Sequence, residues 1–477
     1  MAIKIGVISL GCSKNRINTE QMMFLLRSVG YQISGETEGA DIVLLNTCGF
    51  IESAKAEAIE TILELAAAKE DGRIGKLIVA GCLPERHKED ILDELPEIDA
   101  VVGTGSFDDI VNVVGSLLNN QEDSSCLPDR QTGRMTGENS FFGDINAPVS
   151  ETPRIISTSP AWAYLKIAEG CDNRCAYCCI PDIRGKFRSR PMENIISEAT
   201  KLAESGIREL IIVAQDTTMY GKQGDGSSAL HASKRTVPLL ANLLKALNAI
   251  EKLKWIRLHY LYPDGFDDEL IDVIAKSGKI VKYLDIPIQH INDGILKKMN
   301  RRGSSKDIKS LLKRLREHIP NVVIRTSLIT GLPGEGEDEF NELCDFLQEA
   351  KIERAGVFAY SPEEGTPAAL MARPPKEVAE QRAEQLLDLQ SQIMHEWNES
   401  RIGTTATVLV EGPLEENPFP KSQNHAHYIA RSYAESPEID GYIRINATSK
   451  KPPPPCNTFV DIRITGIENG ILVGEPI

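Results

Sequence analysis

Residues 168–181 read AEGCDNRCAYCCIP, a short segment with four cysteines. Cys171, Cys175 and Cys178 have a CxxxCxxC spacing and follow a predicted strand at 161–168. Thiolates are soft ligands suited to iron–sulfur clusters. Three thiolates leave one iron of a four-iron cubane without a protein ligand, and an open metal position is what chemistry requires. The spacing therefore predicts a reactive 4Fe–4S cluster.

Zinc sites and electron carriers are the alternatives for this trio. Structural zinc sites usually take four ligands in paired CxxC spacings, and electron carriers usually close the cluster with a fourth protein ligand. Three cysteines directly after a β/α strand, with Tyr177 before the third, are typical of radical-SAM enzymes. In these enzymes the open iron binds S-adenosylmethionine (SAM). Cys179 is adjacent to Cys178 and is predicted to be a packed thiol, because both can hardly ligate one cluster.

The chain around this segment alternates strands with helices. Apolar runs separated by helical patterns predict a partial (β/α)6 barrel or an open parallel sheet, followed by a long helix at 375–400. The strands are expected at 161–168, 209–215, 254–260, 282–288, 322–330 and 354–360.

Three further cysteines share one position relative to predicted strands. Each follows directly after an apolar run, and glycine flanks each one. The three are Cys12 after 3–10, Cys48 after 41–47 and Cys82 after 76–81, with Gly11, Gly49 and Gly81 beside them. The carboxyl ends of parallel strands meet at one crevice, so the three thiols are expected to converge there. Three buried core cysteines are the alternative, but three equivalent positions favour a second three-cysteine cluster.

The remaining segments complete the predicted organisation. We expect an N-terminal open parallel α/β domain at 1–120, a polar interdomain linker at 121–158 and the radical-SAM core at 159–400. Short β-rich runs separated by Gly, Pro and Asn predict a small antiparallel β-barrel at 403–477.

Composition limits the function classes. The formal net charge is −16 over 477 residues, which disfavours a large phosphate-backbone interface. No apolar stretch reaches the length of a membrane span, and the first apolar run is expected to be a strand, not a signal peptide. The chain has ten cysteines, and in a reducing compartment the clustered ones are expected to be metal ligands or catalytic thiols, not disulfides. We therefore expect a cytoplasmic protein without a membrane partner.

The two trios, in this order and before a small β-barrel, resemble the radical-SAM methylthiotransferases over essentially the whole chain. The segments that carry the resemblance are SLGCSKNRINTE (9–20), LNTCGFIESAKAEAIETI (45–62), KIAEGCDNRCAYCCIPDIRGKFRSRP (166–191), VAQDTTMYG (213–221), YLDIPIQHI (283–291), MNRRGS (299–304), VFAYSPEEGTPA (357–368) and SPEIDGYIRI (436–445). The chain departs from the usual pattern at Ser13, at INTE (17–20), at Cys179 and at Gly336, and none of these is a predicted ligand.

The resemblance implies a fold, cofactors and an activity. It implies an N-terminal methylthiotransferase domain, a radical-SAM partial barrel and a C-terminal TRAM domain, with SAM and two 4Fe–4S clusters, one on each trio. The segments are closest to the branch that inserts a methylthio group at the β-carbon of an aspartate in small-subunit ribosomal protein S-twelve, giving 3-methylthioaspartate. That activity requires an electron donor and a sulfur donor as partners.

The alternative is the branch that modifies an adenosine beside the tRNA anticodon, with the same cysteines and chemistry. The segment 405–477 holds nine Asp or Glu against six Lys or Arg. A face formed by Glu435, Glu438 and Asp440 would suit a basic ribosomal protein better than tRNA phosphates. A solvated surface is the other interpretation of these carboxylates.

The resemblance and the barrel together imply cofactor-binding residues outside the trios. Strand ends and the loops after them form the active mouth of such a barrel. The candidates are Tyr177, Gln215, Gln289, Arg325 and Gly331. Turn formation and support of neighbouring side chains are the alternative roles for each, and Gly331 is expected to shape the backbone.

Overall fold

The computed structural model describes residues 2–88, 90–119, 134–135, 139–222, 239–414, 426–447 and 455–477. The chain forms two compact units, and each is described by itself. The N-terminal unit contains Met1–Ser157, Lys166–Arg190 and Ser361–Leu370. The C-terminal unit contains Thr158–Leu165, Pro191–Tyr360 and Met371–Ile477.

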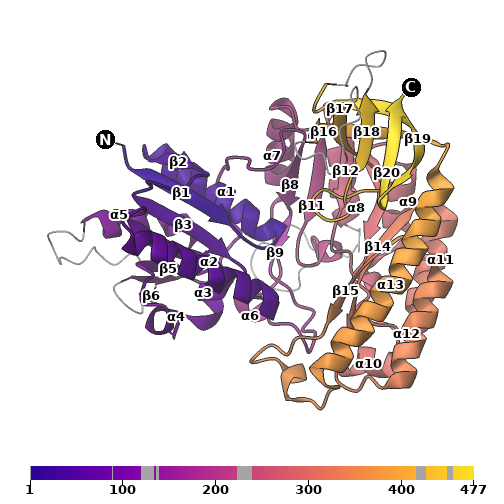
Figure 1. The fold of residues 1–477 in the computed structure, drawn as a ribbon, viewed down its shortest axis with the longest axis horizontal. Coiled ribbons are helices and arrows are strands. Elements are labelled where there is room, and N and C mark those ends of the chain that lie inside the picture. Colours follow the sequence, from indigo (N-terminus) through magenta and orange to yellow (C-terminus); the bar gives the residue numbers. More distant parts are fainter. Residues whose placement is uncertain are drawn as a thin grey trace, which may run out of the picture. The chain divides into compact units, whose positions relative to one another are not determined.

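A seven-stranded sheet in the order β2-β1-β3-β4-β5-β7-β6 is the centre of the N-terminal unit (Figure 1). All neighbours pair in parallel except β6 and β7. The strands are β1 (Lys4–Ser9), β2 (Gln32–Ser34), β3 (Ile42–Thr47), β4 (Lys76–Gly81), β5 (Ala100–Val102), β6 (Arg134–Met135) and β7 (Ser140–Phe142). The order β2-β1-β3-β4-β5 is that of doubly wound sheets, in which ligands bind where the strand order reverses. The predicted N-terminal open parallel α/β fold is confirmed.

Helices cover both faces of this sheet because its central strands are apolar on both sides. β3 is buried at every position. On one face Met22 of α1 (Ser13–Ser28) and Val113 of α5 (Ile110–Asn119) pack on Leu44. On the other face Ile62 of α2 (Glu52–Glu70) and Ile91 of α4 (Asp90–Glu94) belong to a second core. The short elements of this unit are α3 (Cys82–His87), α6 (Ile180–Arg184), β9 (Ala168–Glu169), β10 (Arg188–Ser189), η1 (Phe107–Asp109) and η4 (Pro367–Leu370).

Part of the predicted linker at 121–158 belongs to the sheet. β7 pairs in parallel with β5, and the backbone N–H of Ile155 donates to the carbonyl of Glu20 at 3.0 Å. The side chain of Glu20 accepts from the Ser157 N–H at 2.7 Å and also pairs with Arg154. The segment lacks periodicity because its strands are very short, yet it completes the otherwise unpaired edge of β5.

A six-stranded parallel sheet forms the scaffold of the C-terminal unit, in the order β15-β14-β13-β12-β11-β8 (Figure 1). All six predicted strands are present and follow one another across it. They are β8 (Trp162–Lys166), β11 (Glu209–Val213), β12 (Trp255–Leu258), β13 (Ile280–Asp285), β14 (Val323–Thr330) and β15 (Arg354–Ala359). The helices are α7 (Met192–Glu204), α8 (Leu239–Asn248), α9 (Asp268–Lys276), α10 (Asp293–Lys298), α11 (Ser305–His318), α12 (Glu337–Ala350) and α13 (Lys376–Arg401), with η2 (Thr217–Met219) and η3 (Pro263–Gly265).

The C-terminal segment forms a closed five-stranded barrel in the order β16-β17-β18-β20-β19. Its strands are β16 (Thr405–Pro413), β17 (Ala426–Ser432), β18 (Ile443–Ala447), β19 (Phe459–Glu468) and β20 (Ile471–Pro476). Val408, Ile445 and Ile462 are fully buried in its core. The barrel was expected to be antiparallel and is mixed, because β18 pairs with β20 in parallel.

The loop between β17 and β18 contacts Arg257 in β12, His259 just after β12 and Tyr283 in β13. The Arg257 guanidinium of β12 donates to the Tyr433 carbonyl at 2.8 Å, and His259 Nε2 lies 3.0 Å from Ser436 Oγ. The Tyr283 hydroxyl of β13 donates to Asp440 Oδ2 at 2.6 Å. Charged and polar side chains on the sheet therefore bind the barrel loop in place of solvent.

None of the helices in the described segments is long and apolar enough to cross a membrane.

Candidate functional site

The cysteines of the N-terminal sheet follow three adjacent strands. Cys12 precedes α1 after β1, Cys48 follows β3, and Cys82 begins α3 after β4. β1, β3 and β4 are neighbours in the sheet, so the three thiols lie at one edge, at the point where the strand order reverses. The structure thus places Cys12, Cys48 and Cys82 after three adjacent strands, as the sequence predicted.

Glycines allow the three cysteine loops to approach one another. Gly11 has φ +89°, and a Cβ there would lie 2.9 Å from the Cys48 Cβ. A Cβ on Gly49 would lie 2.8 Å from the Cys82 carbonyl oxygen, and Gly81 has φ +105°. Side chains at these positions would force the loops apart, so the glycines are needed for the thiols to converge.

The thiols of this trio influence one another electrostatically. Burial raises the pKa of Cys48 to about 12, and the neighbouring Cys82 and Cys12 raise it further, against the Phe50 N–H that donates to it. Burial likewise raises the pKa of Cys82. Desolvation opposes ionisation of Cys12 as well, but Lys14, Arg184 and the first N–H groups of α1 lower the pKa of Cys12. A metal cation bound between these three cysteines would stabilise their thiolate forms and so lower their pKa values.

The second trio lies in the loop between β9 and α6. The Cys178 N–H donates to the Cys175 carbonyl at 3.0 Å, and the Cys171 N–H donates to the Gly185 carbonyl at 3.1 Å, so the loop closes on itself. Burial raises the pKa of Cys178 well above its ordinary value, and Cys175 and Cys171 add to that rise, while the Ile180 N–H lowers it. Three cysteine side chains held in one closed loop fit the cationic core of an iron–sulfur cluster, which would stabilise their thiolate forms.

A cluster and a single ion require different spacings of their ligands. Within the described parts of the chain, no three His, Cys, Asp or Glu side chains are close enough together to hold one metal ion. A cubane places each thiolate on a different iron atom, so its ligands stand farther apart than those of one ion. Thiolates with N–H donors directed at sulfur are characteristic of such sites.

Cys179 is a buried packed thiol, as expected. It forms a small apolar cluster with Cys82, Ile183 and Phe50. Burial raises the pKa of Cys179 to about 11. A protonated thiol in an apolar setting is inert.

A strap at 361–370 holds the radical-SAM cysteine loop within the N-terminal unit. The Ala368 N–H donates to the Ala176 carbonyl at 2.9 Å. The buried carboxylate of Glu363 accepts from Arg86 Nη1 at 2.6 Å and from Lys55 Nζ at 3.0 Å. The segment SPEEGTPA, which carries part of the family resemblance, therefore fixes the loop that holds the cysteines.

The candidate SAM-binding residues occupy different environments. Tyr177 is half-buried within the cysteine loop, and Gln215 follows β11. Gln289 follows β13 with φ +73°, and its N–H donates to the Ser327 carbonyl at 2.8 Å. Gln215 and Gln289 therefore lie at strand carboxyl ends, where function is expected in parallel β/α folds.

Arg325 and Gly331 both belong to the β14 region and have structural partners. Arg325 Nη1 lies 2.8 Å from Asp285 Oδ1, and its Nε lies 3.9 Å from Asp440. Gly331 has φ +74°, and its N–H donates to Glu335 Oε1 at 2.8 Å. Gly331 thus shapes the backbone, and the contacts of Arg325 are with carboxylates of its own unit.

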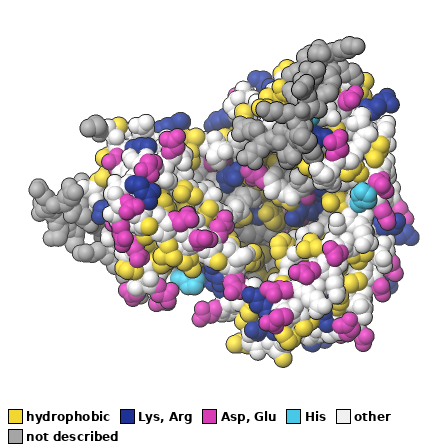
Figure 2. Space-filling view, viewed as in Figure 1, with side chains coloured by type: hydrophobic (Ala, Val, Ile, Leu, Met, Phe, Trp, Pro, Cys, Tyr) yellow, Lys and Arg dark blue, Asp and Glu magenta, His cyan; other side chains and the backbone are white. Residues whose placement is uncertain are grey.

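The proposed acidic face at Glu435, Glu438 and Asp440 is not an exposed patch, and that expectation is wrong. The Glu435 carboxylate is buried and pairs with Arg354 at 2.9 Å and Arg401 at 2.7 Å. The Asp440 side chain is buried, and exposed Glu438 accepts from the Tyr164 hydroxyl at 3.2 Å. On the face shown in Figure 2, acidic and basic side chains are interspersed.

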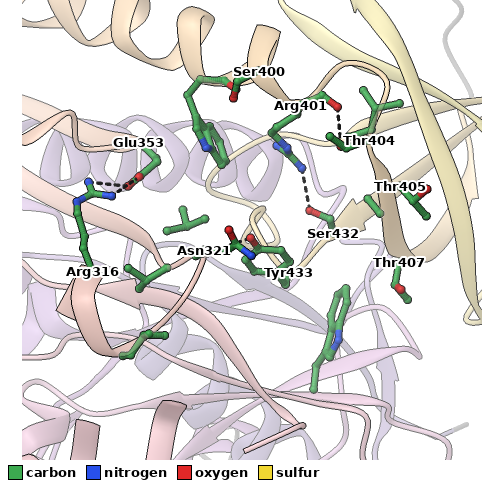
Figure 3. A pocket seen from close by; sticks show the side chains of 17 residues that line it. Arg316, Asn321, Glu353, Ser400, Arg401, Thr404, Thr405, Thr407, Ser432 and Tyr433 are labelled. Atoms are coloured by element: carbon green, nitrogen blue, oxygen red, sulfur yellow. Dashed lines mark hydrogen bonds and ion pairs between the residues drawn. The ribbon is translucent and has the colours of Figure 1, made fainter. Parts of the chain in front are cut away.

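A cavity of about 720 Å³ lies at the opposite end of the six-stranded sheet from the strand carboxyl ends. Trp255 and Val323, the first residues of β12 and β14, line it together with Trp397 and Thr405. Its charged groups are already paired: Arg316 contacts Glu353, and Arg401 contacts Glu435. Arg401 also donates to Ser432 Oγ (Figure 3). This cavity therefore does not belong to the candidate catalytic site.

Arg184 is a site residue to which sequence reasoning assigned no role. Its buried guanidinium lies 3.3 Å from the Cys82 Sγ, although α6 directly follows the other cysteine loop. The only available signal was its place in the segment 166–191, six residues after Cys178.

Three family models match the chain. The Radical SAM superfamily matches residues 165–347, the Uncharacterized protein family UPF0004 matches 4–103, and the TRAM domain matches 402–477.

Curated relatives are similar over their full lengths. A protein of Acetivibrio thermocellus is 44% identical over 100% of this chain and 99% of its own length. One of Geobacter sulfurreducens is 43% identical over 99% of this chain and 98% of its own. One of Clostridioides difficile is 42% identical over 100% of this chain and 99% of its own. Each is named "Ribosomal protein uS12 methylthiotransferase RimO".

Solved structures share the fold at low identity. The radical S-adenosylmethionine methyltransferase TsrM from Kitasatospora setae has a TM-score of 0.55 at 14% identity, over 80% of this chain and 78% of that chain. The cobalamin-dependent radical enzyme OxsB has a TM-score of 0.51 at 13% identity, over 83% of this chain and 56% of that one. These similarities show the fold alone.

Proposed function

The chain belongs to the RimO family of ribosomal protein uS12 methylthiotransferases, and we propose that its two cysteine trios perform different parts of one reaction. It is a radical-SAM enzyme, and membership of that superfamily implies a 4Fe–4S cluster and SAM. The observation that carries the function is identity above 40% over the entire length to relatives with this one activity.

The first part of the proposal assigns the radical-SAM cluster to Cys171, Cys175 and Cys178. Their closed loop and the electrostatic influence of Cys175 and Cys171 on Cys178 support the assignment. Three ligands would leave one iron of the cluster free to bind SAM. The second part assigns another 4Fe–4S cluster to Cys12, Cys48 and Cys82. Their convergence at the strand-order reversal and the N–H donors directed at Cys12 and Cys48 support it.

The two trios divide the chemistry. When bound, the clusters and SAM supply the radical that removes hydrogen from an unactivated carbon and the methylthio group that replaces it. We propose that this carbon is the β-carbon of an aspartate in ribosomal protein uS12 and that the product is 3-methylthioaspartate. Acid–base side chains alone do not break such a bond at useful rates, which is why radical chemistry is required.

Backbone hydrogen bonds of this chain orient the predicted cluster ligands. The closed loop at 171–178 fixes the three thiolates relative to one another, and the strap at 361–370 keeps that loop in place through Ala368. At the other trio, the N–H groups that begin α1 face Cys12 and favour its thiolate form. Tyr177, Gln215 and Gln289 remain candidates for contacting SAM.

Mass spectrometry tests the substrate. The enzyme, reconstituted with iron and sulfide, is incubated with SAM and a reductant together with small ribosomal subunits or with tRNA. We expect one methylthio increment on a peptide of uS12 and none on tRNA. A methylthio increment on tRNA adenosine, with uS12 unmodified, would overturn the assignment.

A further inference from the structure

Arg184 follows one cysteine trio in the sequence, and its side chain contacts the other trio. It is the last residue of α6, the helix that begins two residues after Cys178. Its Nη2 nevertheless donates to the Sγ of Cys82, 102 positions earlier in the sequence, at 3.3 Å. A single side chain from the radical-SAM cysteine segment therefore contacts a predicted ligand of the other cluster.

The guanidinium is held in one orientation by amide side chains. Its Nη1 donates to the Asn18 Oδ1 at 2.8 Å, and its Nη2 also donates to the Asn15 Oδ1. Both asparagines lie on α1, the helix that begins beside Cys12. Asn15 in turn donates to the Thr47 carbonyl at 2.8 Å, one residue before Cys48. The orientation of Arg184 is thus coupled to the loops of all three N-terminal cysteines.

The charged groups around Arg184 include more cations than anions. One carboxylate oxygen, Glu169 Oε2, lies 2.9 Å from Lys166 Nζ and 3.4 Å from Arg184 Nη1. Both cations are almost fully buried. Two buried cations that share one carboxylate carry a net positive charge, which is costly unless another anion is near. The Sγ of Cys82, a predicted cluster ligand, lies 3.3 Å from this guanidinium.

We propose that Arg184 is a positioning residue for the sulfur-inserting half of the reaction. It fixes the N-terminal cysteine loops against the radical-SAM loop and raises the reduction potential of the N-terminal cluster. Hydrogen bonds to cluster sulfur and nearby net charge set such potentials. One-electron reduction adds a negative charge to the cluster, and a fixed adjacent cation stabilises that charge. The inference rests on the proposed function, because it requires the second cluster.

A redox titration of the N-terminal cluster alone tests the proposal. The parent is the full-length chain with Cys171→Ala, Cys175→Ala and Cys178→Ala, reconstituted and titrated with dithionite under electron paramagnetic resonance. Adding Arg184→Gln should lower the reduced-to-oxidised ratio at a fixed potential about tenfold, which is about 59 mV for a one-electron couple. Arg184→Lys keeps the positive charge but loses the planar set of guanidinium N–H donors, so it should shift the ratio less than Arg184→Gln does.

Arg190→Gln is the matched control, because Arg190 is also buried but its guanidinium pairs with Glu151. It should titrate like the parent. If the Arg184→Gln variant binds no N-terminal cluster, the potential of the Arg184→Lys variant is compared with that of the parent instead. An N-terminal cluster potential equal to the parent's in every Arg184 variant that retains the cluster overturns the inference and leaves the proposed function intact. A parent that binds no N-terminal cluster overturns the two-cluster assignment itself.

Discussion

Arg354 of β15 and Glu435 of the β17–β18 loop form a buried ion pair, with 2.9 Å between Nη2 and Oε1. The same carboxylate accepts from Arg401 at the end of α13, and its second oxygen accepts from the Ser432 N–H at 3.0 Å. A carboxylate of the barrel segment therefore pairs with the arginine that begins β15 and the arginine that ends α13. This pair links the six-stranded sheet, through Arg354, to the segment that matches the TRAM domain, through Glu435.

Replacing Glu435 by Gln should destabilise the C-terminal unit. The change leaves Arg354 and Arg401 buried without their shared anion, and breaking a buried pair from one side costs about 3–5 kcal/mol. Chemical denaturation followed by circular dichroism measures the effect. Glu475→Gln, an exposed carboxylate of the same barrel, serves as the control and should change stability by less than about 0.5 kcal/mol. Equal stabilities of the two variants would contradict the prediction.

The contribution of Glu435 should depend on pH in a defined direction. Burial alone would raise its pKa, but Arg401 and Arg354 lower the pKa of Glu435 to about 2. The unfolded value is about 4.3. A lowered folded pKa gives stability that is complete above the unfolded pKa and is lost as pH falls through the folded pKa. The stability gap between the cluster-free wild type and Glu435→Gln should thus be constant above about pH 5 and shrink toward pH 2. A stability difference between the two proteins that stays constant down to pH 2 would contradict this prediction.

Removing the two trios separately should separate the two half-reactions. Replacing Cys171, Cys175 and Cys178 by Ala should abolish production of 5′-deoxyadenosine, measured by chromatography with SAM and dithionite. Replacing Cys12, Cys48 and Cys82 should spare SAM cleavage and stop methylthio transfer to uS12. Cys179→Ala is the control, because it removes a neighbouring packed thiol and should retain both activities. Methylthio transfer by enzyme without an N-terminal cluster would show that the trios are assigned wrongly.

The sequence predicted the features that depend on local pattern. Apolar runs of strand length identified β1, β3, β4 and the six strands of the larger sheet. Spacing predicted one cysteine trio as cluster ligands, and position after a strand predicted the other. β7 was missed because three residues carry no periodicity. The parallel pairing of β18 with β20 was missed because register between distant strands has no local signal.

Long-range charge pairing explains the other errors. Glu435 was expected on a surface because carboxylates are mostly exposed. Its buried partners Arg354 and Arg401 are 81 and 34 positions away in the chain. Arg184 received no role for the same reason, since nothing near it in the sequence indicates contact with Cys82. Buried ion pairs of this kind are visible only after the strands are placed.

Gly331→Ala should be more destabilising than Gly303→Ala. Both residues have positive φ, at +74° and +91°, so both variants bear the left-handed strain of about 1–2 kcal/mol. A Cβ on Gly331 would also lie 2.2 Å from the Cβ of Ala379 on α13, whereas nothing lies within 4 Å of one on Gly303. Overpacking should add about 1–3 kcal/mol to the loss in denaturation experiments. The double variant Gly331→Ala/Ala379→Gly should recover part of that loss, and strict additivity would argue against the clash.

Glu363→Gln should loosen the strap that holds the radical-SAM cysteine loop. Glu363 is 2% exposed and accepts from both Arg86 and Lys55, so the change removes the anion between two cations. The strap contacts the cysteine loop through the Ala368 N–H and the Ala176 carbonyl. Hydrogen exchange followed by mass spectrometry should therefore show faster exchange in peptides covering both 361–370 and 171–179, because local opening follows local stability. Glu364→Gln alters the adjacent exposed carboxylate and should leave both peptides at their wild-type rates. Faster exchange in the strap alone would mean that the cysteine loop is held independently of Glu363.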